Sequence, residues 1–596
     1  MSIPKRSDIP EEFTWDLSAI FENEAAWEKA LGVLGSYAAK IAAFQGKLGE
    51  SAAGLLAFFR LEDETEVLAG KVGGYASLSS DVDLSNGHFQ SLVGRARSTM
   101  VSVFQAGAFS SPEIMAIPQE TLDRFLKEEP SLAEYSRSLY QIRRKAAHIL
   151  GQEAESLLAG MGVFAGAPDR IGSALRNTEL HFPDAVGSDG RTHTLTNGTL
   201  VPLLEEEDRA LRKDAFEKYY TRLAEFKNTI AATLEGQFKK LVFLARARHY
   251  SGTLEAALDS TEVPVPVYRN LIDAVHANLD KMYRYVALRK RLLGVDELHM
   301  YDVYRPIIQG SEARILFPQA KETVLKALSV LGEDYVALLK RAFDERWIDI
   351  YENEGKRGGA YSSGGARPHP YILLNHKDNL DSQFTLAHEL GHSMHSWFSK
   401  ENQPVSTADY VIFVAEVAST VNEVLLMHYL LDHTESKKER AALINHFLDK
   451  FKGTLYRQTM FAEFELMMGE MAEKGETLTA DALSEKYLAI NQLYFGPDMV
   501  SDEGIAYEWA RIPHFFYNYY VFQYATGFSA AVAIASRILK EGAPAVAEYK
   551  KFLSGGSSAD PVSLLKIAGV DMSSPKPVNE ALAYFGKLLD EMEKLV

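Results

Sequence analysis

Cysteine is absent from this 596-residue chain, and its absence excludes several chemistries at once. No disulfide can stabilise the fold, no thiolate can bind a metal ion or an iron–sulfur cluster, and no cysteine can act as a nucleophile. Any metal ion that the protein binds must therefore be held by histidine, aspartate and glutamate side chains.

Long apolar runs and an excess of basic charge are also missing. No window offers the roughly 18 consecutive apolar residues that a membrane-spanning helix needs, and the longest candidate, "DYVIFVAEVASTVNEVLLMHYLL", is interrupted by Glu416 and Glu423. The start, "MSIPKRSDIPEEFTWDLSAIF", lacks the apolar segment of a signal peptide. The net charge of −18 opposes binding to nucleic acid and to anionic lipid. We therefore expect a cytoplasmic protein without nucleic-acid or membrane partners, either monomeric or homo-oligomeric.

Strand patterns are few, and most of the chain has the three-and-four spacing of apolar residues that is typical of helices. The clearest helical patterns cover residues 25–44, 130–150 and 208–247. Two segments resemble strands. One is "GSDGRTHTLTNGTLVPLL" (187–204), whose Asp-Gly and Asn-Gly dipeptides indicate a hairpin. The other is the glycine-rich segment 355–376, which ends in the short run "YILLN".

The length of the chain predicts two or more domains. A long helical region ends near residue 190, where the hairpin pattern begins. We therefore expect an N-terminal helical region over residues 1–190 and a second domain, which carries the motif described next, over residues 191–596. With 46% apolar residues the chain can bury a large core. Because most of its patterns are helical and only two segments resemble strands, we expect a mainly α fold with a small β-sheet.

The segment "TLAHELGHSMHSWF" (385–398) places several metal-binding side chains on a predicted helix. His388 and His392 are four residues apart, so both lie on one face and could bind one ion from adjacent turns. Glu389 lies about 100° around the axis, where it could reach a water molecule beside the ion. Asp381 or Ser382 could cap the start of the helix. Because composition alone would produce His-Glu-x-x-His in about one such chain in thirty, a surface helix with scattered histidines stays an alternative.

A third metal ligand must come from outside the motif. His395 lies about 10 Å along the axis from His388, too far to share an ion, so we expect it to contact substrate or to be a buried core histidine. The position six residues after the second histidine, used in another zinc-peptidase class, is Phe398. Glu416 follows an apolar run typical of a buried helix, where a metal would neutralise its carboxylate. Glu423 shares its face and could hydrogen-bond a ligand histidine or lie at a solvated helix end.

Together, "HELGHSMH" and "FVAEVAS", whose glutamate lies 24 residues beyond His392, resemble the thimet-oligopeptidase-type family of zinc metallopeptidases. The whole chain resembles the bacterial oligoendopeptidase F branch through "FTWDLSAIF", "GKRGGAY", "PYILLNH" and "ARIPHFFYNYYVFQYATG". A departure from the thimet members is "EVAS", where they carry proline after the alanine. The resemblance implies helical lobes around an enclosed substrate channel, a small sheet near the His-Glu-x-x-His helix, and one Zn²⁺ per chain held by His388, His392 and Glu416.

The resemblance also implies a catalytic role for an aromatic segment. By themselves, His514, Tyr517 and Tyr520 fall on helical three-residue steps and would indicate core packing. The family places a histidine and tyrosines opposite the zinc ion, where they would stabilise the oxyanion of the reaction. The separation of histidine and tyrosine is longer in thimet members than in this chain.

A peptide-binding strand is implied in the glycine-rich segment. The residues Gly358, Gly359, Ala360 and Tyr361 would form an edge strand whose backbone pairs with an extended peptide, without a side-chain role for Tyr361. A flexible turn between strands is the alternative.

These observations predict a zinc-dependent endopeptidase that cleaves short, unstructured peptides by a metal-activated water molecule, with Glu389 as the general base. Two other functions stay open. One is a zinc hydrolase that acts on another amide or ester. The other is a catalytically inert helical binding protein, which would usually lack Glu389 or the third ligand, whereas both are present in this sequence.

Overall fold

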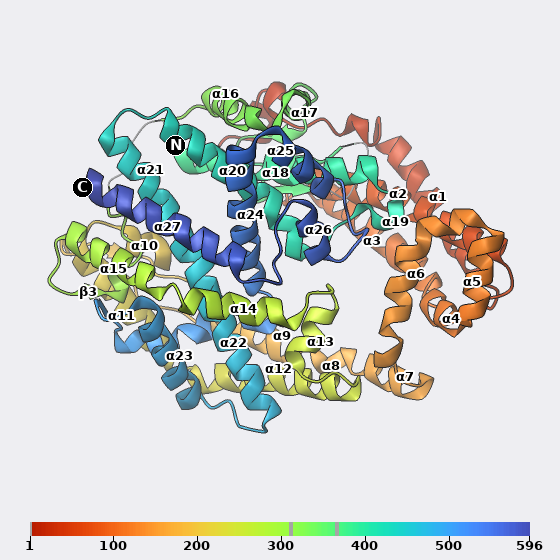
Figure 1. The fold of residues 1–596 in the computed structure, drawn as a ribbon, viewed down its shortest axis with the longest axis horizontal. Helices are drawn as coiled ribbons and strands as arrows, with labels where there is room; N and C mark the ends of the chain where they lie inside the picture. The colour runs from red at the N-terminus through yellow and green to blue at the C-terminus, as the bar shows by residue number, and fades with distance from the viewer. Residues whose placement is uncertain (1–2, 309–313, 364–368) are drawn as a thin grey trace. The chain divides into compact units, whose positions relative to one another are not determined.

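The structure is a computed structural model that describes residues 3–308, 314–363 and 369–596 (Figure 1). Helices dominate, and each strand has only two or three residues. The predicted mainly α fold is therefore confirmed. Among the described residues, every helix is too short or too polar to span a bilayer. The chain forms two compact units, each built from three separate segments. These units do not test the predicted division at residue 190, which stays a prediction.

The first unit comprises Met1–Ala146, Glu312–Tyr429 and Ile534–Gly569. Its α-helices are α1 (Glu24–Ala42), α2 (Ala52–Asp81), α3 (Gly87–Ala106), α4 (Ser110–Ala116), α5 (Gln119–Glu128), α6 (Ser136–Arg143), α16 (Phe317–Ala327), α17 (Glu333–Asp344), α18 (Leu380–Asn402), α19 (Val405–Ala408), α25 (Ala543–Leu553) and α26 (Pro561–Ile567). Short 3₁₀ helices are η1 (Arg6–Asp8), η2 (Glu11–Phe13), η3 (Leu17–Ala19), η4 (Pro130–Tyr135) and η8 (Leu328–Leu331). Three elements have residues in both units: η5 (Arg144–His148), α20 (Ile412–Asp432) and α24 (Phe522–Glu541).

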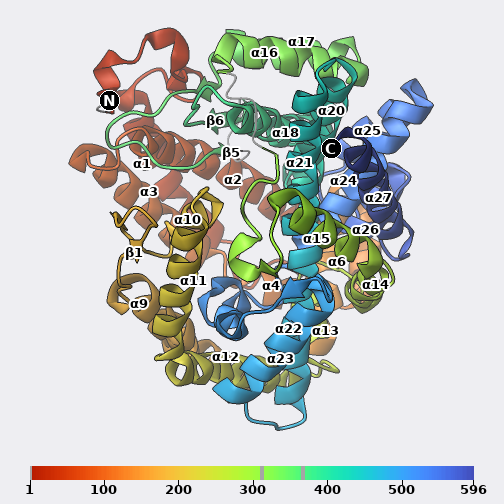
Figure 2. The same cartoon turned by 90° about the vertical axis from the view of Figure 1, so that its left-hand side faces the viewer.

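A helical core forms at the start of the first unit. Helices α1, α2 and α3 lie side by side (Figures 1 and 2) and enclose apolar side chains such as Trp27, Leu34 and Phe58. The indole of Trp27 donates a hydrogen bond to the carbonyl oxygen of Val72 at 2.9 Å. Burial of each large apolar side chain contributes about 1.5–3 kcal/mol, and His388, His392 and Glu416 are not part of this core.

The first unit contains a three-stranded sheet in the order β4 (Ile348–Asp349), β6 (Tyr371–Leu373), β5 (Tyr361–Ser363). Strand β6 pairs in parallel with β4 and antiparallel with β5, which confirms the strands expected in residues 355–376. Figure 2 shows β5 and β6 beside α18. Trp15 packs edge-on against Tyr371, whose hydroxyl donates to the carbonyl oxygen of Asp16. The N-terminal segment thus covers the sheet that lies next to the His-Glu-x-x-His helix.

The second unit comprises Ala147–Ser311, Leu430–Ala533 and Val570–Val596. Its α-helices are α7 (Gln152–Gly160), α8 (Gly162–Ala165), α9 (Ala167–Ala174), α10 (Leu200–Glu205), α11 (Arg209–Ala224), α12 (Lys227–Ala247), α13 (Thr253–Asp259), α14 (Val265–His276), α15 (Leu279–Leu293), α21 (Lys437–Lys450), α22 (Arg457–Glu473), α23 (Ala480–Phe495) and α27 (Lys576–Leu595). Shorter elements are the π-turns η6 (Leu175–Glu179) and η9 (Phe451–Tyr456), the 3₁₀ helices η7 (Met300–Asp302), η10 (Glu503–Arg511) and η11 (Pro513–Phe516), the antiparallel pair β1 (Ala185–Val186) and β2 (Thr192–His193), and the parallel pair β3 (Leu298–His299) and β7 (Met499–Val500).

The predicted hairpin is shorter than its sequence pattern indicates. Its strands end at His193, and the expected strand residues from Leu200 onward are helical. The hydroxyl of Thr199 accepts from the backbone of Thr196 and donates to the carbonyl oxygen of Thr194, and these bonds replace strand pairing at the start of α10. The pattern over 208–247 is likewise two helices, α11 and α12, separated at residues 225–226. The pattern over 130–150 contains 3₁₀ turns on both sides of α6.

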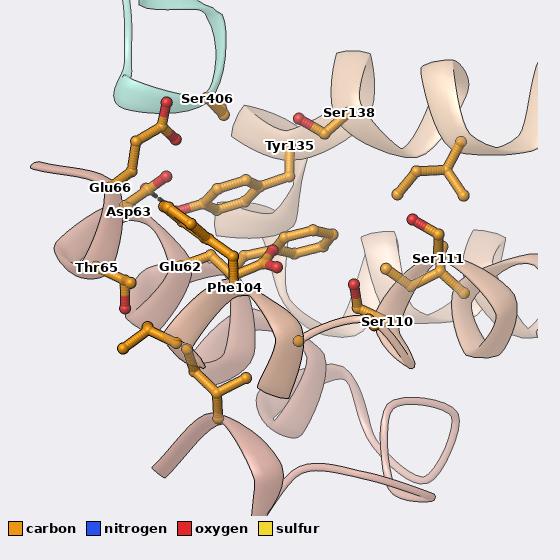
Figure 3. A pocket seen from close by; sticks show the side chains of 17 residues that line it. Glu62, Asp63, Thr65, Glu66, Phe104, Ser110, Ser111, Tyr135, Ser138 and Ser406 are labelled. Carbon is orange, nitrogen blue, oxygen red and sulfur yellow. Dashed lines mark hydrogen bonds between the residues drawn. The ribbon is translucent and has the colours of Figure 1, made fainter. Parts of the chain in front are cut away.

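A cavity of about 340 Å³ in the first unit is lined by acidic side chains of α2 (Figure 3). Glu62, Asp63 and Glu66 face it, and the hydroxyl of Tyr135 donates to Asp63 at 2.5 Å. Burial, together with the charges of Asp63 and Glu66, raises the pKa of the Glu62 carboxyl to about 7. The folded protein therefore binds a proton at Glu62 more tightly than the unfolded chain does.

Glu62→Gln should stabilise the protein in a pH-dependent way. Because the pKa of Glu62 is raised on folding from 4.5 to about 7, the wild type loses stability as pH rises through this interval. We expect the variant to melt about 2 °C or more above the wild type at pH 8 and to match it near pH 4.5. Glu64→Gln, at an exposed site on the same helix, is the control. Melting-temperature differences that do not change with pH would contradict the assignment.

Candidate metal centre

Helix α18 carries the His-Glu-x-x-His motif and begins one turn before the apolar pattern. Its cap is Asn379, whose side chain accepts a hydrogen bond from the backbone N–H of Ser382 at 2.8 Å. The expectation that Asp381 or Ser382 caps this helix is therefore wrong, because both lie within its first turn. The hydroxyl of Ser382 instead accepts from the backbone of Lys377. The apolar face of the helix is buried through residues such as Leu390 and Met394.

Helix α20 packs against α18 at very short range. A Cβ atom built on Gly391 would lie 2.5 Å from the Cα of Ser419 and 2.6 Å from the carbonyl oxygen of Ala418, so only glycine fits there. Asn422 fixes the register of the two helices, because its amide donates to the carbonyl oxygen of Ala387 at 3.0 Å. Its side-chain oxygen accepts from the hydroxyl of Tyr335 on α17 at 3.2 Å.

This packing brings His388, His392 and Glu416 together. The Nε2 atoms of the two histidines lie 3.2 Å apart. Oε2 of Glu416 lies 3.3 Å from Nε2 of His388 and 3.5 Å from Nε2 of His392. The hydroxyl of Ser419 lies 2.9 Å from the carbonyl oxygen of Glu416 and 3.2 Å from its Oε2, so its single hydrogen is shared between these two acceptors. Three atoms that could bind one metal ion, two from α18 and one from α20, thus form a nearly equilateral triangle.

Two further carboxylates adjoin this triangle. Oε1 of Glu423 lies 2.6 Å from Nδ1 of His388. Of the two alternatives for Glu423, the hydrogen bond to a histidine of the motif is therefore the one that the structure contains. Such a bond leaves Nε2 of His388 free to bind a metal ion. Glu423 is only 4% exposed, which excludes a solvated helix end. Glu389 is 6% exposed, and its Oε2 atom is buried without a hydrogen-bond partner among the described residues.

The charges of this group favour a cation. Burial alone would lower the pKa of the His388 imidazole, but hydrogen bonds to Glu416 and Glu423 raise it to about 10. Burial alone would raise the pKa of the Glu416 carboxyl, but hydrogen bonds from His388 and His392 hold it well below its usual range. Burial raises the pKa of Glu389, and the charges of the two neighbouring histidines offset this effect only in part. A positive charge is therefore stabilised among the three carboxylates, as a metal-binding site requires.

His395 is buried in the first unit and is 1% exposed. Its ring stacks on that of Tyr410 with centroids 3.7 Å apart and also contacts Phe552. Burial lowers the pKa of His395 to about 3, so the imidazole is neutral. This is the arrangement of a core histidine, one of the two alternatives that the sequence leaves open.

The aromatic segment lies in the second unit and is not a continuous α-helix, as its three-residue steps suggested. The 3₁₀ helix η11 ends at Phe516, Asn518 and Tyr519 have positive φ angles of 55° and 61°, and α24 begins at Phe522. The helical reading fails because these two residues reverse the sense of the backbone.

The rings of the aromatic segment nevertheless gather. The centroids of His514, Tyr517 and Tyr520 lie 5.5–6.4 Å from one another. Tyr524, which sequence reasoning did not single out, lies 5.4 Å from Tyr520. Tyr517 is 50% exposed, the largest exposed fraction that a tyrosine of this group reaches.

The glycine-rich segment leads into β5. Gly358 and Gly359 precede the strand, and Gly359 has a φ of +83°, which favours glycine. The amide of Asn375 donates to the carbonyl oxygens of Arg357 and Gly359 and fixes this turn beside β6. The hydroxyl of Tyr361 donates to Asp81 of α2. Within residues 3–308, 314–363 and 369–596, β5 pairs only with β6 and is therefore an edge strand of the sheet, with Ala360 directly before it.

Family models, curated relatives and solved structures all match this chain to oligopeptidases. The family model described as "Peptidase family M3" matches residues 202–584, and the model described as "Oligopeptidase F" matches residues 113–182. The chain is 43% identical to oligopeptidase PepF of Bacillus subtilis, over 100% of this chain and 89% of that protein. It is 38% identical to group B oligopeptidase PepB of Streptococcus agalactiae, over 99% and 98% of the two chains. It resembles the crystal structure of oligoendopeptidase-F from Enterococcus faecium with a TM-score of 0.75 and 37% identity, over 96% and 99% of the chains.

Loss of any of the three donor side chains should abolish metal binding and leave the fold intact. His388→Ala, His392→Ala and Glu416→Ala each remove one vertex of the triangle, whereas the helical core does not depend on the ion. Metal content per chain, with circular dichroism as the folding control, measures both. Full metal content in Glu416→Ala would identify another third ligand, with Glu423 or Asp409 as the next candidates.

Gly391→Ala should weaken metal binding although it alters no donor. The added methyl group would force α20 away from α18 and would move Glu416 relative to the histidines. We expect at least about a tenfold loss of metal affinity and a destabilisation of roughly 1–3 kcal/mol. Gly94→Ala is the matched control, because a Cβ there meets open space on helix α3. Equal affinity and stability in both variants would show that the helices adjust without cost.

Proposed function

The chain belongs to peptidase family M3, and from this premise we propose that this metalloendopeptidase uses zinc to cleave internal bonds of short, unstructured peptides. The observation that carries the proposal is the triangle of His388, His392 and Glu416 beside the buried carboxyl of Glu389. Peptide substrates follow from the family. The choice of zinc, the size limit of the substrates and the roles below are the proposal.

The donor set fits zinc. Two imidazole nitrogens and one carboxylate oxygen are ligands that catalytic zinc sites use. Bonds of about 2.0–2.1 Å at tetrahedral angles separate neighbouring ligand atoms by about 3.3–3.4 Å, and the three separations here are 3.2, 3.3 and 3.5 Å. Zinc held by these side chains would supply a Lewis acid that polarises the scissile carbonyl and lowers the pKa of water.

Glu389 is the general base in this proposal. It follows His388 directly on α18, and its Oε2 atom has no hydrogen-bond partner among the described residues, so it can accept a proton from the attacking water. The raised pKa of this buried carboxyl suits a group that takes a proton and then returns it to the leaving amine. Glu423 acts indirectly, because its bond to Nδ1 fixes the orientation of His388.

His514, Tyr517 and Tyr520 would donate hydrogen bonds to the oxyanion that develops on the scissile carbonyl. Their clustering in one segment of the second unit and the exposure of Tyr517 support this role. The backbone from Gly358 to Tyr361 would pair with the extended peptide, and the position of β5 at the end of its sheet supports this role.

A mixed peptide pool tests the proposed reaction. Incubation with the purified protein, followed by mass spectrometry, should give internal cleavages that a chelator abolishes and added zinc restores. Cleavage that persists after complete metal removal would overturn the proposal, and exclusive release of single terminal residues would show an exopeptidase.

Glu389→Gln should separate metal binding from chemistry. The amide keeps the shape of the side chain but cannot accept the proton from water. We expect unchanged zinc content and a decrease in kcat of at least about a hundredfold. Metal analysis and steady-state kinetics on one preparation test both, and near-normal turnover would remove Glu389 from the mechanism.

Tyr520→Phe, and to a smaller extent Tyr517→Phe, should lower kcat more than they raise KM. An oxyanion donor acts in the transition state, and its loss costs about 3 kcal/mol, or on the order of a hundredfold in rate. Tyr283→Phe is the control, because it removes a hydroxyl of α15 that donates to the carbonyl oxygen of Leu493 on α23, outside the aromatic cluster. Unchanged kcat in both test variants would mean that the cluster serves packing.

A further inference from the structure

The turn between η11 and α24 adopts a conformation that its residues disfavour. Asn518 and Tyr519 both lie in the left-handed region, with φ angles of 55° and 61°. Asparagine tolerates this region, but a bulky aromatic residue rarely occupies it. Two consecutive residues with left-handed backbone angles persist only where the surrounding structure holds them, and such strained residues are frequent at functional sites. This turn lies between Tyr517 and Tyr520, to which the proposed function assigns the oxyanion.

A buried carboxyl group holds the strained backbone. Oε1 of Glu465, on α22, accepts a hydrogen bond from the backbone N–H of Tyr519 at 2.6 Å. Glu465 is fully buried, and its Oε2 has no hydrogen-bond partner among the described residues. Burial raises the pKa of Glu465 to about 8, only partly offset by the bond from Tyr519. Burying such a group is costly, and the one hydrogen bond that it makes with the described residues is to the strained residue.

The side chain of Tyr519 is anchored as firmly as its backbone. The ring is 2% exposed and lies edge-on to Phe238 of α12 and Tyr268 of α14. Its hydroxyl lies 2.7 Å from Oγ1 of Thr253, the first residue of α13. Because the Thr253 hydroxyl donates its own hydrogen to Glu473, the Tyr519 hydroxyl is the donor to Thr253.

Two other residues, Gly469 and Gln237, complete the contacts that hold this turn. Any side chain at Gly469, one turn after Glu465 on α22, would collide with the Tyr519 hydroxyl. Gln237 of α12 is 1% exposed, and its amide donates to the carbonyl oxygen of Phe516 at 3.0 Å and to Oδ1 of Asn518 at 2.8 Å. Contacts from α12, α13, α14 and α22, all within the second unit, therefore converge on the turn.

We propose that Glu465 is a positioning residue for catalysis, which holds the strained turn at Tyr519 so that Tyr517 and Tyr520 present their hydroxyls in one fixed geometry. This inference rests on the proposed role of the two tyrosines. Tyr519 itself does not contact substrate in this scheme, because its ring is buried. The contacts that hold Tyr519 fix the backbone that carries the two flanking tyrosines. Tyr520 lies one residue after Tyr519, and Tyr517 lies two residues before it.

A pair of substitutions at Glu465 tests the proposal. Glu465→Gln keeps a side-chain oxygen that accepts from the Tyr519 N–H, whereas Glu465→Met has similar length and no such acceptor. We expect Glu465→Met to lower kcat at least about tenfold with little change in KM, because displaced donors act in the transition state. Glu465→Gln should restore most of this loss. Glu470→Met is the control. Glu470 lies on the same helix as Glu465 and forms an exposed salt bridge to Arg269 of α14, so its loss should leave kcat unchanged.

Hydrogen–deuterium exchange identifies the cause. The peptide that spans residues 515–522 should exchange faster in Glu465→Met than in the wild type and Glu465→Gln, at temperatures well below melting. A Glu465→Met variant that melts earlier but keeps wild-type kcat at low temperature would overturn the proposal, since that is the result of a purely structural role. Should Glu465→Met fail to fold, Thr253→Val removes the other anchor almost isosterically and should give the same decrease in kcat with KM retained.

Tyr517→Phe and Tyr520→Phe, measured in parallel, separate this inference from the proposed function. Reduced kcat in the tyrosine variants with unchanged kcat in Glu465→Met and Thr253→Val would overturn the positioning role alone. Unchanged kcat in the tyrosine variants would overturn the oxyanion role, and the positioning role with it.

Discussion

The backbone contact between α18 and α20 at Gly391 is the constraint on which the grouping of His388, His392 and Glu416 depends. Helices usually pack with their axes 8–10 Å apart because side chains lie between them. Here the backbone of residues 418–419 occupies the space that a Cβ of Gly391 would need. Glutamate has a short side chain, so Glu416 can reach Nε2 of both histidines only from a helix this close. Asn422 then sets the register, and a shift by one residue would turn Glu416 about 100° away.

The same packing determines the chemistry of the group. Three carboxylates and two imidazoles lie in a largely buried space, where unpaired charge is costly. Each of His388 and His392 contacts Glu416, and Glu423 contacts His388, so most of the polar atoms support one another. Oε2 of Glu389 stays without a partner among the described residues. Free energy from the apolar cores of the first unit offsets the cost of this arrangement, and the protein can therefore keep the carboxyl group of Glu389 buried.

Sequence patterns predicted the parts of the site that follow from helical geometry. His388 and His392 follow from their spacing, and Glu416 follows from a carboxylate within an apolar run. The close contact at Gly391 was not predictable, because a glycine within a helix has the same pattern whether it faces solvent or another backbone. The cap at Asn379 was missed because the helix begins before its apolar pattern does. The turn at Asn518 and Tyr519 was missed for a different reason: the spacing of the aromatic residues matches a helix, and only contacts from four distant helices force the backbone out of it.

The two groups of proposed catalytic residues are therefore held by different means. The proposed metal ligands lie on long helices, whose backbone hydrogen bonds fix each Cα without strain, so the precision of the triangle comes from helix packing. The aromatic donors lie on a short irregular segment that lacks such support and includes two left-handed residues. A segment of this kind keeps one conformation only if buried polar groups make that conformation better than its alternatives. This requirement explains why α22 carries a buried carboxyl group at Glu465, although burying it is costly. The carboxyl accepts a hydrogen bond from the backbone N–H of the strained residue itself.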